Sequence, residues 1–291
     1  MLDSFIDFLA AEKRFSEHTS VAYRKDLEQF LDFIGINKED DLEEVSSKVI
    51  RGWMVHLMEK GLTSQTVNRK LSSLRTYFKW LRKNGVLENN PMQLILGPKN
   101  SKRLPSFAQK KELEAERLDD LFESDFNGVR DRLMFEVFYQ TGIRLSELIG
   151  LKLGDVSADQ LKVLGKRNKE RIVPIAKELN EFVREYLIKR QELCLKCDSF
   201  FVLKTDKKLY PKFVYRRINS YLSRATDMKK NSPHVLRHTF ATHMLNNGAG
   251  LEVLKELLGH ANLSATQVYT HNSFAELTTI YSQSHPRGQK K

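Results

Sequence analysis

Four amphipathic stretches occupy the first 85 residues of this 291-residue chain, and they constrain the fold more than any other feature. In each stretch apolar residues recur every three or four positions, which is the spacing of a helix with one buried face. The stretches span residues 2–9, 23–34, 49–57 and 67–81, and Gly35, Gly61 and Gly85 follow the last three. Glycine ends helices readily because it adopts the left-handed conformation. The pattern predicts four helices, with Ser16 and Ser46 as candidate N-caps.

Helical periodicity stops between residues 89 and 106. This stretch contains three prolines, Gly97 and several basic residues, a composition typical of a linker. We therefore expect an N-terminal helical domain over 1–88, an interdomain linker over 89–106, and a C-terminal domain with its tail over 107–291. Basic residues in such a linker would suit a segment that crosses a phosphate backbone.

The pattern changes in the second part of the chain. An apolar stripe over 133–138 predicts a helix that ends at Gly142. Residues 161–164 and 171–175 resemble two strands of a hairpin, joined by a polar loop. Helical spacing then returns, and Ser232-Pro233 has the sequence of an N-cap followed by a first-turn proline. The predicted fold class is mainly α with a small antiparallel β-sheet.

Composition limits the partners and the chemistry. Lys and Arg total 48 against 37 Asp and Glu, so the formal charge is +11, which favours either a polyanionic partner or simply a basic soluble protein. Cys194 and Cys197 are the two cysteines, too few for a zinc site, and we expect them to be reduced thiols. No signal peptide and no apolar run of membrane-spanning length is present, which predicts a cytoplasmic protein without membrane insertion.

The polar face of the stretch over 67–81 is basic. It carries Asn68, Arg69, Ser72, Arg75 and Lys79. Such a face either lies against DNA phosphates or is solvated, and one helix taken alone does not separate the two interpretations.

Groups suited to phosphodiester cleavage are concentrated near the C-terminus. His234 and Arg237 are three residues apart, and His260 and Tyr269 follow; Arg144 and Lys166 lie upstream. A tyrosine can supply a nucleophilic oxygen, while cations offset the charge that builds on phosphate oxygens in the transition state. A tyrosine in isolation is more often a packing residue. The chain has no P-loop pattern and no carboxylate cluster beside these groups, so neither ATP use nor a two-metal mechanism is indicated, and we predict no cofactor and no metal.

Four motifs in order resemble those of the tyrosine recombinase (phage integrase) family, in particular its Xer type. They are Thr141-Gly142-Ile143-Arg144-Leu145-Ser146-Glu147-Leu148, Gly165-Lys166-Arg167-Asn168-Lys169-Glu170-Arg171, His234-Val235-Leu236-Arg237-His238-Thr239-Phe240-Ala241-Thr242-His243, and Leu257-Leu258-Gly259-His260 through Tyr269. The resemblance runs nearly from end to end. It implies an N-terminal four-helix core-binding (SAM-like) domain that grips DNA and a C-terminal α+β catalytic domain.

The resemblance also implies a role for each candidate. Tyr269 would be the nucleophile, Lys166 the general acid for the departing 5′-oxygen, and His234 and His260 would contact the proton in flight or the phosphate. Arg144 and Arg237 would clamp the phosphate, because a guanidinium offers two parallel hydrogen bonds to its oxygens.

Alternatives remain for several of these residues. Arg144 is also placed to form a surface salt bridge with Glu147, and His234 with Arg237 is also consistent with a buried structural pair. Lys169 and Arg171 are positional rivals of Lys166. We assign no chemistry to His238, His243 and His271, although the family's motifs contain similar residues.

The function implied is site-specific DNA recombination through a 3′-phosphotyrosyl intermediate and a Holliday junction, resolving chromosome dimers at a dif-like site. The partners would be double-stranded DNA, a homo- or hetero-tetramer with a related recombinase, and an FtsK-type DNA translocase. The tail over 278–286 would dock on a neighbouring subunit, and residues 287–291 would be a frayed terminus. The alternatives are an integrase or invertase of a mobile element, a type IB-like topoisomerase, and an architectural DNA-binding protein with a vestigial site.

Overall fold

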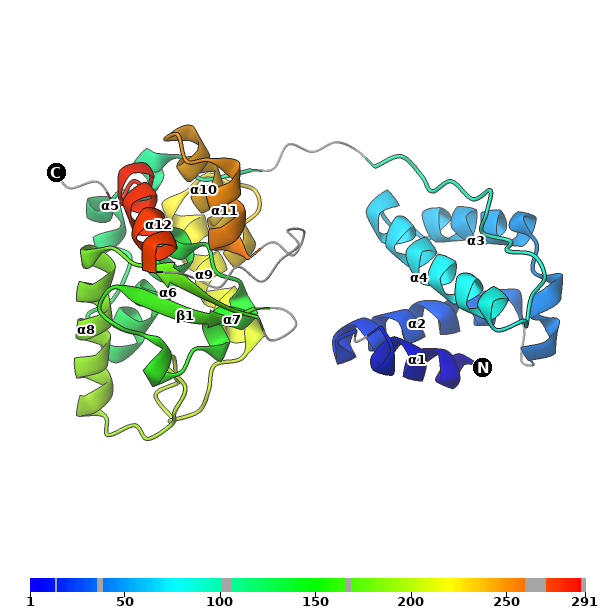
Figure 1. Cartoon of the computed structure of the whole chain (residues 1–291), viewed down its shortest axis with the longest axis horizontal. Coiled ribbons are helices and arrows are strands. Elements are labelled where there is room, and N and C mark those ends of the chain that lie inside the picture. Colours follow the sequence, from blue (N-terminus) through cyan, green and yellow to red (C-terminus); the bar gives the residue numbers. More distant parts are fainter. Residues whose placement is uncertain (14, 36–38, 101–105, 166–168, 260–270, 289–291) are drawn as a thin grey trace. The chain divides into compact units, whose positions relative to one another are not determined.

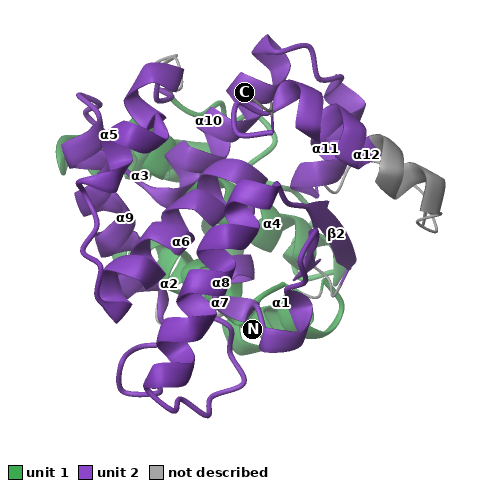
Figure 2. Ribbon diagram, turned by 90° about the vertical axis from the view of Figure 1, so that its left-hand side faces the viewer, with its two compact units in different colours: residues 1–103 green, residues 104–291 purple. Residues whose placement is uncertain are grey.

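The computed structural model describes residues 1–288 except 14, 36–38, 101–105, 166–168 and 260–270. The chain divides into two compact units, Met1–Arg103 and Leu104–Lys291, shown in Figures 1 and 2. Within the described residues, no helix combines the length and apolar character that crossing a membrane would demand.

Unit 1 is helical, as predicted. Its elements are α1 (Leu2–Ala11), α2 (Glu17–Ile34), the 3-10 helix η1 (Glu39–Glu44), α3 (Ser47–Glu59) and α4 (Ser64–Lys83). The Ser16 hydroxyl caps α2 by accepting the Thr19 N–H, whereas Ser46 occupies the N-cap of α3 without a side-chain bond. Gly35, Gly61 and Gly85 all have positive φ, which confirms the glycine stops read from the sequence.

A buried carboxylate joins α2 to α4. Asp26, 1% exposed, accepts hydrogen bonds from Lys70 Nζ (2.9 Å), Ser73 Oγ (2.9 Å) and Arg69 Nη2 (2.8 Å). Burial alone would raise the pKa of Asp26, but the bonds from Arg69, Lys70 and Ser73 outweigh it and lower that pKa. Around this network the helices pack through aromatic rings, for example Phe30 and Trp53 with centroids 5.1 Å apart.

The residues that follow α4 fold back along it. Arg75 Nη2 donates to the Ile95 carbonyl (3.0 Å), and Asn68 Nδ2 donates to the Pro98 carbonyl (2.8 Å). Contact is so close at Gly97 that a Cβ there would lie 1.8 Å from Asn68 Oδ1. Two members of the polar face on α4 therefore bind the chain's own backbone, an arrangement the sequence analysis did not foresee.

Unit 2 is mostly helical and contains a two-stranded antiparallel sheet. Its elements are η2 (Lys110–Leu113), α5 (Ala115–Asp119), α6 (Phe126–Thr141), α7 (Leu145–Gly150), η3 (Leu153–Asp155), β1 (Gln160–Leu164), β2 (Glu170–Pro174), α8 (Lys177–Glu192), α9 (Pro211–Ala225), α10 (Pro233–Asn246), α11 (Leu251–Leu258) and α12 (His271–Ser284). This confirms the predicted fold class, including the hairpin, in which Val163 faces Arg171.

Helix α6 forms the centre of unit 2. Its residues are buried on every side from Gly128 to Thr141, because α8 and α10 pack against it (Figure 2). Gly142 then ends the helix with φ +61, as the sequence predicted. A Cβ at Gly142 would lie 2.5 Å from Phe240 Cδ1, so α10 also requires glycine at this point.

The C-terminal tail packs on its own unit. His285 is fully buried, with Nε2 3.2 Å from the Tyr139 carbonyl, and Asn247 Nδ2 donates to the Ser284 carbonyl (2.7 Å). Arg287 forms ion pairs with Glu136 (3.3 Å) and Glu178 (3.2 Å). The expectation of a frayed terminus is thus wrong at Arg287, because a fully buried carboxylate, that of Glu136, retains it.

Candidate active site

Arg144 lies just beyond the end of α6, at the N-cap of α7. Its Nη1 donates to Glu147 Oε1 (2.7 Å), its backbone N–H to Glu147 Oε2 (2.7 Å), and its Nη2 to the Gly259 carbonyl (3.0 Å). The Arg144 side chain is 35% exposed while that of Glu147 is 3% exposed. The salt bridge considered for Arg144 is therefore present, but its carboxylate is buried rather than on the surface.

Glu147 is shared with a second arginine, Arg171 of β2. Arg171 donates to both Glu147 oxygens (2.8 and 3.0 Å), and its Nε donates to the Leu257 carbonyl (2.9 Å). Burial acts to raise the pKa of Glu147, but the bonds and charge of Arg171, followed by the bonds of Arg144, lower it to about 2. Arg171 was a positional rival for the role of Lys166; in the structure it anchors Glu147, a role the sequence analysis missed.

Arg237 extends from the first turns of α10, which Ser232 caps and Pro233 opens as predicted. Its Nη1 donates to the Gly142 carbonyl (2.6 Å) and its Nη2 to the Leu258 carbonyl (2.8 Å), and the residue is 7% exposed. Burial, together with the nearby charges of Arg144 and Arg171, lowers the pKa of Arg237 to about 10, although Glu147 opposes the shift. The guanidinium is still fully charged at neutral pH.

The three guanidiniums converge on the C-terminal end of α11. Arg171, Arg237 and Arg144 bind the carbonyls of Leu257, Leu258 and Gly259 in turn. These carbonyls lack partners within the helix and lie at its negative end, so cations satisfy them well. Gly259, with φ +63, ends α11, and a Cβ there would lie 3.1 Å from Arg171 Nη1. We call Arg144, Arg171, Arg237 and Glu147 the guanidinium cluster.

His234 is exposed in the first turn of α10, three residues before Arg237. The pKa of His238 is lowered by partial burial and by the charge of His234 one turn away. His234 is thus a surface residue and not part of a buried pair with Arg237.

Lys166, His260 and Tyr269 lie outside the described residues. The described residues that directly precede His260 and Lys166 in the sequence lie close to the guanidinium cluster. Gly259 directly precedes His260, and a Cβ at Gly165, directly before Lys166, would lie 3.5 Å from Arg171 Nη1. The Gly165 N–H also donates to the Lys169 carbonyl (2.7 Å), which closes the base of the hairpin loop.

His243, Cys194 and Cys197 were assigned no chemistry, and their surroundings are as follows. His243 is buried, with Nδ1 3.2 Å from the Tyr139 hydroxyl. Cys194 is exposed, and both cysteines are free thiols. Among the residues that the structure describes, no group of three or more His, Cys, Asp or Glu is placed to hold a metal ion.

The chain has nine tyrosines. Those that the structure describes differ in how accessible they are, and therefore in how well they could act as nucleophiles. Tyr139, Tyr186 and Tyr281 are almost fully buried, and burial raises the pKa of each phenol. A phenol that is inaccessible and harder to ionise is a poor nucleophile. Tyr210 and Tyr215 on and beside α9 are about half exposed, at 49% and 48%, and are the described rivals of Tyr269 in unit 2.

Comparison with known proteins agrees across most of the chain. Residues 110–276 match the Phage integrase family, and residues 2–85 match the N-terminal SAM-like domain of phage integrases. The chain is 37% identical over 298 residues to Tyrosine recombinase XerC of Bacillus subtilis (strain 168), covering 99% of this chain and 96% of that protein. It is 35% identical to Tyrosine recombinase XerC of Chlorobaculum parvum (strain DSM 263 / NCIMB 8327), covering 98% and 94%.

Two solved structures share the fold. One is the XerH site-specific recombinase bound to palindromic difH substrate in a post-cleavage complex, with a TM-score of 0.73, 24% identity, and coverage of 97% of this chain and 83% of that one. The other is a lambda integrase tetramer bound to a Holliday junction, with a TM-score of 0.68, 17% identity, and coverage of 92% and 79%.

Proposed function

We propose, from the premise that this chain belongs to the phage integrase family and is a site-specific tyrosine recombinase of the Xer type, that Tyr269 is its nucleophile. The phenolic oxygen attacks a DNA phosphate, forms a 3′-phosphotyrosyl ester and releases a 5′-hydroxyl. A 5′-hydroxyl from another duplex then attacks that ester and frees Tyr269. One phosphoester replaces another at each step, so the reaction needs no external energy source such as ATP.

The observation that carries this proposal is the guanidinium cluster. It gathers three arginines around the one carboxylate of Glu147, an excess of positive charge. It also fixes the end of α11, from which the chain continues into His260 and Tyr269. A cationic site of this kind stabilises the pentacoordinate phosphorus of the transition state and favours the ionised form of a nearby phenol.

Each candidate residue takes a part in this scheme. Arg144 and Arg237 hold the non-bridging phosphate oxygens, and the 35% exposure of Arg144 leaves it accessible to DNA. Lys166 protonates the departing 5′-oxygen, and His260 donates to a phosphate oxygen. His234, exposed beside Arg237, accepts the phenolic proton. No metal or cofactor takes part.

The substrate is double-stranded DNA, which residues 1–88 bind as the core-binding domain and residues 107–291 bind and cleave as the catalytic domain, with 89–106 as linker. The XerC relatives and the difH complex of a XerH recombinase favour a dif-like chromosomal site and a role in resolving chromosome dimers. We propose that this reaction takes place in the cytoplasm. Four protomers, identical or with a related recombinase, assemble on two duplexes through a Holliday junction, and an FtsK-type translocase controls them.

The tail has a part in this control. Helix α12 begins at His271, two residues after Tyr269, and the tail that follows is anchored through Ser284, His285 and Arg287 on its own unit. We propose that the same anchors hold a neighbouring subunit's tail in the assembled complex. Exchange of the tail would then move the Tyr269 segment.

Strand exchange tests the proposed function. DNA fragments recovered with the protein from its host are incubated with the full chain, and joined products and four-way junctions are scored on native gels. Wild type is expected to form both, and Tyr269→Phe to bind DNA but form neither, whereas Tyr215→Phe serves as the matched control.

The same preparation separates the rival functions. Relaxation of a supercoiled plasmid that lacks the recovered site, without any joined product, would contradict the proposal and favour a type IB-like topoisomerase. Recovery of mobile-element ends in place of a chromosomal site would favour the integrase alternative.

A further inference from the structure

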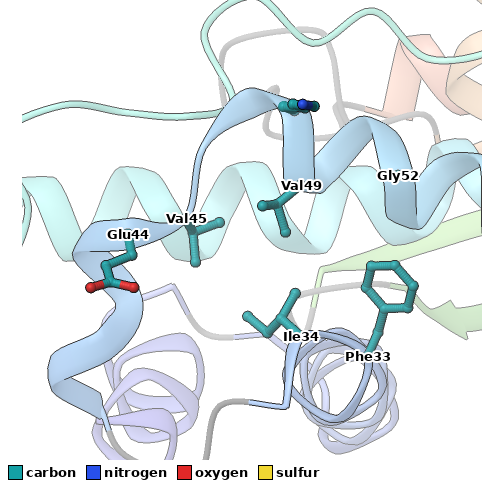
Figure 3. A pocket seen from close by; sticks show the side chains of 7 residues that line it. Phe33, Ile34, Glu44, Val45, Val49 and Gly52 are labelled. Atoms are coloured by element: carbon teal, nitrogen blue, oxygen red, sulfur yellow. The ribbon is translucent and has the colours of Figure 1, made fainter.

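An apolar groove opens on unit 1 between the end of α2 and the first half of α3. Its volume is about 570 Å³, and it is lined by Phe33, Ile34, Glu44, Val45, Lys48, Val49 and Gly52. In Figure 3, Val45 and Val49 of the α3 side face Ile34 and Phe33 of α2 across the groove. Phe33 is 38% exposed although it is a large aromatic residue. Apolar surface of this kind is a common mark of a protein–protein contact.

An acidic segment leads in the sequence to the α3 side of the groove. The sequence of η1, Glu39-Asp40-Asp41-Leu42-Glu43-Glu44, has five carboxylates in six residues, in a protein of net charge +11. Glu43 and Glu44 are exposed, and Lys48 is the cation among the groove's lining residues. Carboxylates repel DNA phosphates, so this surface is unsuited to DNA. Its chemistry calls for an apolar segment with basic residues.

The chain itself contains such a segment. Leu94 is 74% exposed and Leu96 is 88% exposed, the two highest values among the large hydrophobic residues that the structure describes. Between them Ile95 is buried at 4%, and Arg75 holds its carbonyl, so the backbone is fixed with the leucines directed outwards. Lys99 follows, then Lys102 and Arg103 in the sequence. We call residues 94–99 the leucine edge.

We propose that the leucine edge of one copy docks in the α2/α3 groove of a second copy. Leu94 and Leu96 would fill the apolar groove, and Lys99 would face the carboxylates of Glu43 and Glu44. We choose this segment as the occupant of the groove because its basic residue complements the carboxylates beside the groove. The groove is lined from α2, η1 and α3, whereas the leucine edge is fixed on α4 through Arg75 and Asn68, so the two surfaces belong to different elements.

A contact between two different surfaces is heterologous, and repeated contacts of this kind generate a ring when the rotation between successive copies closes. The proposed function requires several copies around two DNA duplexes, and the inference rests on that function for its purpose. It adds which surfaces of unit 1 join the copies. The contact would be salt-sensitive, because exposed charges contribute to it.

Cysteine cross-linking tests the contact directly. In the full chain with Cys194→Ser and Cys197→Ser, one preparation carries Val49→Cys and a second carries Leu96→Cys. They are mixed with a synthetic four-way DNA junction and oxidised mildly, and dimers are scored on non-reducing gels. The matched control replaces Leu96→Cys by Val21→Cys, an apolar position that is 60% exposed and lies about 18 Å along α2 from Phe33.

Docking raises the effective concentration of the two thiols, so the Val49→Cys and Leu96→Cys mixture is expected to give at least about tenfold more dimer than the Val21→Cys control. Equal yields in the two mixtures, or no dimer, would overturn the inference. Covalent protein–DNA adduct is measured in the same tubes with a nicked junction. Adduct without the specific cross-link would reject this contact while leaving the proposed function intact, whereas loss of the adduct alone would reject the function and leave the contact standing.

Discussion

Each unit contains a buried carboxylate that binds several cations, but the two carboxylates connect different parts of the structure. In unit 1, Asp26 binds Arg69, Lys70 and Ser73, all of which lie on α4. In unit 2, Glu147 binds Arg144 and Arg171, which come from the N-cap of α7 and from β2. We compare these as the Asp26 network and the guanidinium cluster.

The difference lies in what the cations reach beyond the carboxylate. In the Asp26 network they end on side chains of α2, so the network simply joins two helices. In the guanidinium cluster they continue to main-chain carbonyls at the end of α11, next to His260. The first arrangement stabilises a fold, and the second also positions cations at the point where the chain enters the Tyr269 segment. Excess buried charge that is not needed for packing is a mark of function.

Neutralising each carboxylate should separate the two networks most strongly. Glu147→Gln leaves Arg171 buried without its counter-charge, and we expect unit 2 to lose about 3–5 kcal/mol of unfolding free energy. Asp26→Asn should cost unit 1 a similar amount, because Lys70 is 5% exposed. Hydrogen exchange resolved by unit measures both. Loss of protection in both units from either variant would contradict the separation.

Removing one arginine from each network should separate their chemistry. Arg237→Ala is expected to raise the activation free energy of DNA cleavage by about 3 kcal/mol, because one preorganised transition-state donor is lost. Arg69→Ala, whose side chain is 50% exposed, should leave single-turnover cleavage on saturating DNA within about threefold of wild type. Single-turnover rates on a nicked duplex give the answer. A cleavage rate for Arg237→Ala close to that of Arg69→Ala would remove the functional distinction.

Acid should affect the tail before it affects the guanidinium cluster. Burial, and then the charges of His243, Arg287 and Lys110, lower the pKa of His285 to about 3, although its bond to Tyr139 opposes this. A histidine whose pKa is lower in the folded state than in the unfolded state binds a proton more readily when the chain is unfolded. The free energy of unfolding therefore decreases as the pH falls from about 6.5, the unfolded pKa, towards 3, the folded pKa.

The pKa of Glu147 is lowered from 4.5 to about 2, so its contribution is lost later, between those two values. Proteolysis of the tail at decreasing pH should therefore accelerate by up to about tenfold per pH unit from pH 6.5. His285→Gln keeps a donor for the Tyr139 carbonyl but does not titrate, and it should flatten this dependence. An unchanged pH profile in His285→Gln would contradict the assignment.

The sequence predicted features that depend on neighbours along the chain. Helix periods, the glycine stops at Gly35 and Gly142, the Ser232 cap and the β-hairpin are all local, and all are present. It also placed Arg144 and Arg237 as candidate clamps, and both belong to the guanidinium cluster.

Long-range contacts were not predictable in this way. Arg171 meets the Leu257 carbonyl 86 residues away, and Arg144 meets the Gly259 carbonyl 115 residues away. Periodicity carries no information about such main-chain acceptors. For the same reason the sequence left Glu147 on the surface, missed the packing of residues 95–98 on α4, and expected Arg287 to be frayed.

The most direct test of the account identifies the residue that carries the DNA. Wild-type protein is trapped on a nicked duplex, the adduct is digested with protease and nuclease, and the nucleotide-bearing peptide is sequenced by mass spectrometry. We predict the modification on Tyr269. A nucleotide on Tyr210 or Tyr215, or on any residue other than a tyrosine, would contradict the central claim.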